Sequence, residues 1–185
     1  MKVLDITHFY NKKSGGVKRY LEEKVRYLSD KNINHLLILP SEEDKTQKKL
    51  NSKYYFIKSP EIPFFKPYRF ILNKKKVIEV LNTEKPDIVE VGSPYLIPSW
   101  INKNKEKFGY KTIGFFHSNI EGSISSIFKS FDKIFSPPAK KWIKREYGSF
   151  DLVVSPSKYV ENYLNDIGIN NTATIYLGID SSTFL

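Results

Sequence analysis

The chain has 185 residues, of which 40% are hydrophobic and 15% aromatic, and its formal net charge is +10. This length suits one domain with one hydrophobic core. The sequence contains no cysteine, which excludes disulfides, thiolate nucleophiles and cysteine-ligated zinc. No apolar run approaches the roughly 20 residues that span a bilayer, and Asp5 interrupts any signal-peptide core, so we expect a cytoplasmic protein.

The positive charge is compatible with a polyanionic partner such as nucleic acid, an anionic membrane or a phosphorylated substrate. It comes from 26 lysines and only 4 arginines. Because arginine is the side chain that recognises phosphates and base edges in a bidentate manner, this composition does not favour nucleic-acid recognition. A bias towards Lys, Asn and Ile across the source proteome is an alternative explanation. We therefore expect no nucleic-acid partner.

The first predicted strand, residues 2–8, leads through Ser14-Gly15-Gly16 into a predicted helix. The helix carries apolar residues on one face, namely Val17, Leu21, Val25 and Leu28. Two glycines let the backbone approach a ligand closely, and the following helix N-terminus offers free N–H groups and a positive dipole end to a phosphate or carboxylate. The alternative is that the glycines only form a tight turn. Their spacing matches neither a dinucleotide-binding fingerprint nor a P-loop.

Further strands and helices alternate along the rest of the chain. Strands are expected at 34–39, 53–58, 87–91, 111–116, 151–155 and 172–176, and helices around 77–81, 98–107, 140–147 and from 157 to Gly168. The charged stretch 41–51 is expected to be a mobile loop, and 59–68, with three prolines, an irregular extended segment. The alternation predicts an α/β fold with a doubly wound, mostly parallel, Rossmann-like sheet.

Ligands of such sheets bind beyond the carboxyl ends of the strands. Three segments are expected there: the loop 8–16, the segment 90–95 with Glu90, Ser93 and Tyr95, and the segment 114–119 with His117, Ser118 and Asn119. At such a rim His117 could hydrogen-bond a sugar hydroxyl or a developing charge. The alternative for His117 is a structural hydrogen bond, and His35 is interpreted as structural.

Metal and hydrolase chemistry find little support in the sequence. The three histidines share no short motif, and no Asp-x-Asp occurs, so no metal site is predicted. Glu90 has no second carboxylate nearby in sequence, and a two-carboxylate hydrolase is not indicated.

Several short motifs together resemble a known family. In order, these are Gly15-Gly16-Val17-Lys18-Arg19-Tyr20, His117, Val153-Val154-Ser155-Pro156-Ser157 and Leu177-Gly178-Ile179-Asp180 with Phe184. They resemble the N-terminal, acceptor-side domain of retaining glycosyltransferases of family 4, which have the GT-B fold, and the resemblance covers almost the whole chain. The segments Glu90 to Pro94 and Gly114 to His117 are most similar to members that transfer mannose or a related hexose to lipid-type acceptors.

The resemblance implies roles for individual residues. Gly15 and Gly16 would approach the donor diphosphate or the acceptor, and His117 would contact the donor hexose near the transferring carbon. Lys18 and Arg19 would add positive charge, or simply face solvent. Such enzymes use a UDP- or GDP-hexose as co-substrate without a metal, and they stabilise charge through placed dipoles and cations. The acceptor would be a lipid-linked sugar or a glycan.

The sequence departs from the family pattern in one respect. The donor half of the family carries a glutamate, seven residues and a second glutamate, and no such pair occurs here. We therefore expect residues 1–185 to form the N-terminal domain, with the C-terminal donor-binding domain absent from this chain. Little or no transferase activity is expected from the 185 residues alone.

Basic and aromatic residues alternate near residues 129–145. Phe131, Phe135 and Trp142 are interleaved there with the cationic residues Lys129, Lys133, Lys140, Lys141, Lys144 and Arg145. Lysines near an anionic leaflet contribute on the order of 1 kcal/mol each, so peripheral docking on the inner face of a membrane is one hypothesis. The alternative is a solvated basic helix whose aromatic side chains lie in the core.

Two other functions compete with the transferase hypothesis. One is another two-domain sugar-nucleotide enzyme, such as an epimerase. The other is a stand-alone binding module for an anionic glycan, a lipid or nucleic acid, for which a steep salt dependence of nucleic-acid binding would be evidence.

Overall fold

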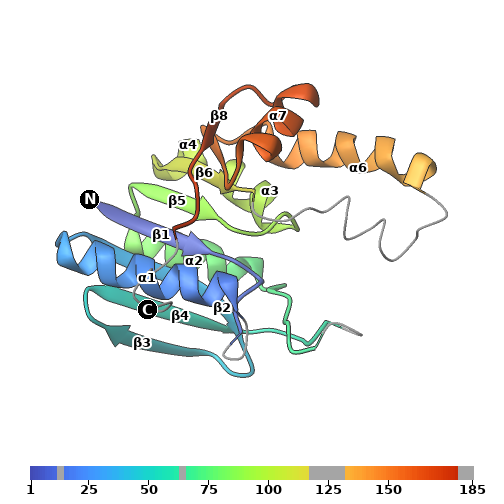
Figure 1. Ribbon diagram of the computed structural model, residues 1–185. Helices are drawn as coiled ribbons and strands as arrows, with labels where there is room; N and C mark the ends of the chain where they lie inside the picture. Colours follow the sequence, from blue (N-terminus) through green and yellow to red (C-terminus); the bar gives the residue numbers. More distant parts are fainter. Residues whose placement is uncertain (12–14, 63–65, 117–131, 179–185) are drawn as a thin grey trace. The chain divides into compact units, whose positions relative to one another are not determined.

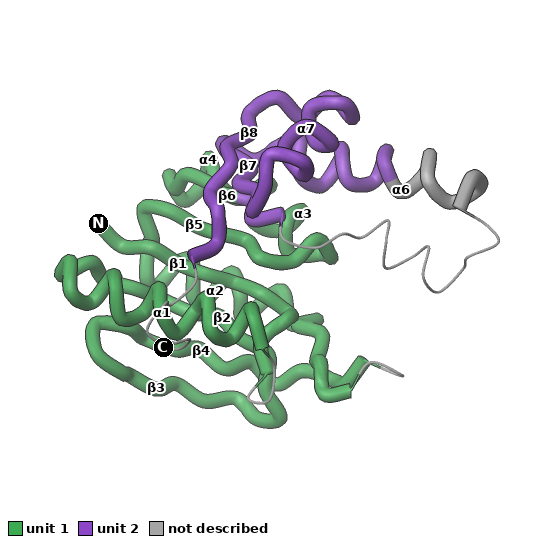
Figure 2. Tube along the Cα trace, viewed as in Figure 1, with its two compact units in different colours: residues 1–113 green, residues 114–185 purple. Residues whose placement is uncertain are grey.

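The computed structural model describes residues 1–11, 15–62, 66–116 and 132–178, with side chains in the last range from residue 140 onward (Figure 1). The chain divides into two compact units, residues 1–113 and 114–185 (Figure 2). No helix of the described ranges is long and apolar enough to cross a bilayer.

The first unit is a mostly parallel sheet with helices. Its elements are β1 (Lys2–Ile6), α1 (Gly16–Asp30), β2 (Asn34–Ser41), β3 (Lys45–Lys49), β4 (Ser52–Lys58), α2 (Lys74–Glu84), β5 (Ile88–Val91), α3 (Ile97–Asn102) and α4 (Lys105–Phe108). The strand order is β3-β4-β2-β1-β5. β1 pairs in parallel with β2 and β5, β2 pairs in parallel with β4, and only β3 in this order is antiparallel to its neighbour. The predicted fold class is confirmed.

Helices cover both faces of this sheet. Successive side chains of a strand point to opposite faces, so both faces of the central strands need a covering layer. On one face, Tyr54 and Phe56 of β4 pack against a core cluster that includes Leu21 and Val25 of α1. On the other face, Lys53 and Tyr55 both hydrogen-bond Glu84 at the end of α2. The central strands are therefore buried on both sides, which explains why β2 reads as a continuous apolar run.

Two expectations from the sequence were wrong in detail. Residues 41–51 are not a loop, because residues Lys45–Lys49 form β3 and pair with β4 across a turn in which Leu50 has a φ of 53°. All five side chains of β3 are exposed, so the strand has no apolar periodicity to reveal it. Lysines on an edge strand also discourage pairing with other chains. The helix expected over 98–107 is split into α3 and α4.

The second unit contains the end of β6 (Lys111–Phe115), followed by α6 (Asp132–Tyr147), β7 (Leu152–Ser155), α7 (Lys158–Asp166) and β8 (Thr172–Thr174). β7 and β8 pair in parallel. The predicted boundaries of α7 are confirmed, because the Ser157 hydroxyl accepts the Val160 N–H at 3.3 Å and Gly168 follows the helix with a φ of 82°.

Gly114 has a packing role within this second unit. A Cβ atom at this position would lie 2.9 Å from Tyr147 and 3.0 Å from Phe150 ring atoms. Replacing Gly114 with alanine is therefore expected to lower the free energy of unfolding by about 1–2 kcal/mol through overpacking. Thermal and denaturant unfolding would measure this loss. At Gly178 a Cβ meets nothing within 4 Å, so Gly178→Ala is the control, and an equal effect of the two variants would contradict the packing role.

Candidate functional site

The loop after β1 and the segment after β5 lie side by side at the carboxyl edge of the first unit. The Thr7 hydroxyl donates to the Gly92 carbonyl at 3.2 Å, and the Gly92 N–H donates to the Ile6 carbonyl at 3.0 Å. The His8 N–H donates to the Ser93 hydroxyl at 3.4 Å. Two of the three segments expected to share an edge are thus brought together.

His8 also connects these two segments to residues 66–73, which were not predicted to lie at this edge. Its ring is fully buried and stacks on Phe70, with the ring centroids 4.1 Å apart. Its Nε2–H donates to the Tyr95 carbonyl at 3.1 Å, and its Nδ1 accepts the Ile71 N–H at 3.3 Å. Burial lowers the pKa of His8 to about 4, although the Tyr95 carbonyl opposes the shift. A neutral imidazole therefore holds the edge together, a role that the sequence analysis missed.

Aromatic side chains gather around this histidine. The ring of Phe9 meets Tyr68 edge-on at 6.2 Å and Tyr95 at 6.4 Å, and Phe70 lies 5.8 Å from Tyr95. We call these four residues the aromatic rim. Tyr95 is 37% exposed, and the next residue, Leu96, is 44% exposed. Such a surface suits the apolar face of a sugar or the glycerol region of a lipid.

The turn into α1 carries the glycine pair. Gly15 precedes the helix with an ordinary φ of −81° and no side-chain cap bond, and the first turn contains no acidic residue. A Cβ atom at Gly15 or Gly16 would meet nothing within 4 Å. Among the described residues, packing therefore does not require glycine at either position. The open space beside the pair is what close approach of a ligand to this turn would need.

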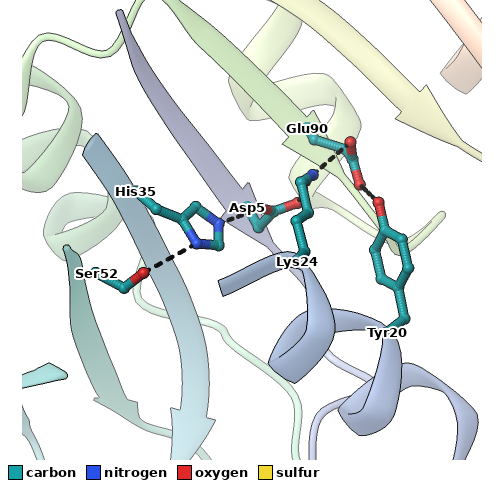
Figure 3. Close-up of polar contacts among 6 residues, drawn as sticks. All are labelled: Asp5, Tyr20, Lys24, His35, Ser52 and Glu90. Atoms are coloured by element: carbon teal, nitrogen blue, oxygen red, sulfur yellow. Dashed lines mark hydrogen bonds and ion pairs between the residues drawn. The ribbon is translucent and has the colours of Figure 1, made fainter. Parts of the chain in front are cut away.

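A cluster of charges lies beneath this edge (Figure 3). Lys24 of α1 places its Nζ 2.8 Å from Asp5 Oδ1 of β1 and 2.7 Å from Glu90 Oε2 of β5. The Tyr20 hydroxyl donates to Glu90 Oε1 at 2.8 Å. On the far side of Asp5, the Nε2 of His35 lies 2.5 Å from Oδ2. The interpretation of His35 as structural fits this buried position.

Desolvation and the close charges set the protonation of this cluster. Burial raises the pKa of Glu90 to about 7, the Asp5 charge adds to the rise, and Lys24 and Tyr20 partly offset it. For Asp5, burial alone would raise the pKa, but Lys24 and the hydrogen bond from His35 hold it well below its usual range. Burial would lower the pKa of Lys24, yet Asp5 and Glu90 raise it. Near neutral pH, Glu90 is therefore the member of the cluster that takes up or releases a proton.

The residues predicted to bind substrate differ in their surroundings. Ser93 is buried and faces His8, whereas Tyr95 is exposed in the aromatic rim. The Glu90 carboxylate bonds Tyr20 and Lys24, so its described contacts hold α1 against β5. Lys18 lies 3.8 Å from Glu22, and Arg19 is exposed.

Three further predicted residues, His117, Ser118 and Asn119, lie outside the described residues. The same is true of Phe131, and the side chain of Phe135 is not described. In α6, the basic side chains Lys140, Lys141, Lys144 and Arg145 are exposed and Trp142 is half-buried.

The model of Glycosyltransferase Family 4 matches residues 14–183. A GDP-mannose-dependent alpha-(1-6)-phosphatidylinositol dimannoside mannosyltransferase of Mycobacterium tuberculosis (strain ATCC 25177 / H37Ra) is 22% identical over 186 residues, which cover 100% of this chain and 48% of that protein. The chain thus spans about half the length of this curated relative.

Solved structures share the fold. Sucrose-phosphate synthase from Thermosynechococcus elongatus superposes with a TM-score of 0.64 at 10% identity, covering 100% of this chain and 93% of that one. The catalytic domain of starch synthase IV from Arabidopsis thaliana, bound to ADP and acarbose, superposes with a TM-score of 0.56 at 15% identity, covering 98% and 52%. At these identities the likeness shows the fold alone.

Proposed function

The chain belongs to glycosyltransferase family 4, and we propose that it is the acceptor-side half of a retaining glycosyltransferase. The enzyme moves a hexose, mannose or a close relative, from a sugar nucleotide to a lipid-linked or glycan acceptor. The observation that carries the proposal is the family match over residues 14–183. The glycine pair before α1 and the aromatic rim at the carboxyl edge of the first unit support it.

The donor in this proposal is GDP-mannose or a UDP-hexose. The name of the mycobacterial relative specifies GDP-mannose. The bond from the sugar carbon to the diphosphate oxygen breaks, and a bond to the acceptor oxygen forms on the same face. The proton of the acceptor hydroxyl passes to the departing diphosphate oxygen. Negative charge grows on the diphosphate. The backbone N–H groups at Gly15 and Gly16, with Lys18 and Arg19, offset it without a metal.

His117 is the proposed catalytic residue, in contact with the donor hexose, and Ser118 and Asn119 are proposed to bind substrate beside it. These assignments follow from the family motif. The aromatic rim is proposed to bind the acceptor.

The proposed location of the enzyme is the cytoplasmic face of a membrane. The exposed cations of α6 are suited to an anionic leaflet. Co-sedimentation with neutral and anionic vesicles at low salt tests this location, and equal binding to both would contradict it.

Deleting the gene tests the proposed function directly. Mass spectrometry of the glycolipids and glycans of the deletion strain is expected to show an acceptor that lacks one hexose. Returning the gene restores the hexose. The purified 185-residue chain is expected to turn over GDP-mannose or UDP-hexoses little, with or without EDTA. Unchanged glycolipid and glycan profiles would overturn the proposal, and robust transfer by the purified chain would overturn its division into halves.

The glycine pair yields a prediction that separates binding from folding. Replacing Gly16 with valine adds a side chain in open space, so the free energy of unfolding is expected to change by less than about 1 kcal/mol. The same variant is expected to restore less than about a tenth of the missing product, because the added carbons exclude the ligand from the turn. Glu23→Val, at a side chain on α1 that is 57% exposed, is the control and should restore full product. Full activity of Gly16→Val would contradict a ligand at this turn.

A further inference from the structure

The first unit contains a groove that is distinct from the charge cluster and the aromatic rim. It lies on the α1 side of the outer strands β4 and β3, where α1 packs on β2 and leaves the sheet margin open. We call it the edge groove. Its lining residues come from α1, the sheet and the segment after β1, and the cavity volume is about 200 Å³. Drug-sized ligands occupy about 300–1,000 Å³, so this space suits a single ring with its substituents.

The floor of the edge groove is aromatic. Parallel pairing of β2 with β4 and antiparallel pairing of β4 with β3 align Leu37, Tyr54 and Gln47 in one row across the sheet. In the next row, Phe56 lies opposite Lys45. The rings of Tyr54 and Phe56 are nearly parallel, at an angle of 11°, with centroids 5.9 Å apart. Both side chains are only half-buried. The Lys45 Nζ lies over the Phe56 ring, 5.2 Å from its centroid, so the Tyr54 ring is the apolar surface that the floor offers to a ligand.

The walls of the groove are polar, with opposite chemistry on the two sides. On β3, Lys45, Gln47 and Lys49 line the groove and provide donors. On the opposite side, Glu22 of α1 provides a carboxylate. Tyr10, Glu22 and Tyr54 all line the groove. Burial, Tyr10 and Glu22 raise the pKa of Tyr54.

We propose that the edge groove binds one hexopyranose unit of a glycan. A pyranose has an apolar face of C–H groups, which suits stacking on the Tyr54 ring. Its hydroxyls both donate and accept hydrogen bonds, and the groove offers donors on β3 and an acceptor on α1. This inference rests on the proposed function in one respect: the sugar is taken to be a further unit of the acceptor.

Saturation-transfer NMR on the 185-residue chain tests the proposal, with methyl α-mannopyranoside and α-(1→6)-mannobiose as probes. Both are expected to receive saturation at their ring C–H protons. Tyr54→Ala is expected to weaken binding about tenfold, because it removes the stacking surface. Gln47→Ala and Lys49→Ala are expected to weaken it about two- to tenfold.

The neighbouring lysine of the same strand provides the matched control. Lys48 points to the opposite face of the sheet, because it pairs with Lys53, whose Nζ bonds Glu84 of α2. Lys48→Ala is expected to leave binding unchanged. Gln47 and Lys49 are exposed, so their variants keep the test valid even if Tyr54→Ala unfolds.

Three results would overturn the edge groove as a saccharide site. The first is the absence of saturation transfer to either probe. The second is binding that is equally strong in the wild type and in the variants Gln47→Ala and Lys49→Ala. The third is displacement of the sugar by GMP through the same side chains. The gene-deletion result is independent of these outcomes. A missing hexose without groove binding refutes only the groove, whereas groove binding with unchanged glycans refutes only the transferase.

Discussion

Replacing Lys24 with methionine is expected to lower the free energy of unfolding by about 3–5 kcal/mol. Lys24 is the cation between two buried carboxylates, since the side chains of Asp5 and Glu90 are only 4% and 12% exposed. Without it, either two like charges face each other in a medium that solvates neither of them, or Glu90 takes up a proton, because loss of the cation raises the pKa of Glu90 further. Denaturant unfolding at pH 8, where Glu90 is mostly ionised, measures the loss.

The control is Arg26→Met on the same helix. Arg26 pairs with Glu23 at 2.9 Å, but its side chain is 68% exposed. Exposed pairs of this kind contribute about 0–1 kcal/mol. A loss from Lys24→Met that does not exceed the loss from Arg26→Met would show that Lys24 does not neutralise the cluster.

The double variant Lys24→Met/Glu90→Gln extends this test. Removing the second carboxylate charge relieves the repulsion with Asp5, so the double variant is expected to be more stable than Lys24→Met alone. The two changes are therefore non-additive, as expected for groups in direct contact. Additive losses would indicate that Glu90 and Lys24 act independently.

The helices and parallel strands of this fold could be predicted because their apolar patterns are local. Leu21, Val25 and Leu28 of α1 are buried as their spacing predicts. β3 could not be predicted in the same way. Its sequence, Lys45–Lys49, has no buried side chain, and its conformation comes from pairing with β4. Strand propensity depends strongly on such a tertiary context.

The charge cluster was hidden for a different reason. Asp5 and Glu90 are register partners on neighbouring parallel strands, although 85 positions separate them in sequence. The sequence alone does not reveal Asp5 as a neighbour of Glu90, because only the strand order brings the two carboxylates together. One signal was present. Lys24 lies three residues after Leu21 and four before Leu28, so it falls on the apolar face of α1, where a lysine needs a buried partner.

Glu90 also makes stability depend on pH. Its pKa is about 7 in the folded chain against an ordinary value of 4.5. Between these values the folded chain holds one more proton than the unfolded chain, so raising the pH favours unfolding. The stabilising effect of the protonated carboxyl is complete below pH 4.5 and is lost as the pH rises through 7. The total change is on the order of 3 kcal/mol.

His8 acts in the opposite direction over part of this range. Its pKa is about 4 against an ordinary 6.5, so its contribution is complete above pH 6.5 and is lost as the pH falls towards 4. Between pH 4.5 and 6.5 the two groups largely cancel in the wild-type protein. A free energy of unfolding that is constant with pH in that interval therefore does not show the contribution of Glu90 alone.

Comparing Glu90→Gln with the wild type isolates the contribution of Glu90. Glutamine stays neutral at every pH, so the wild type is expected to lose stability relative to the variant as the pH rises from 5 to 8. The difference should change by about 2–3 kcal/mol over this range. Denaturant unfolding at pH 5, 6, 7 and 8 measures it. Glu23→Gln, at a side chain that is 57% exposed, should differ from the wild type by no more than about 0.5 kcal/mol throughout. A constant difference between Glu90→Gln and the wild type, or one that favours the wild type at high pH, would mean that Glu90 is ionised in the folded protein well below neutral pH.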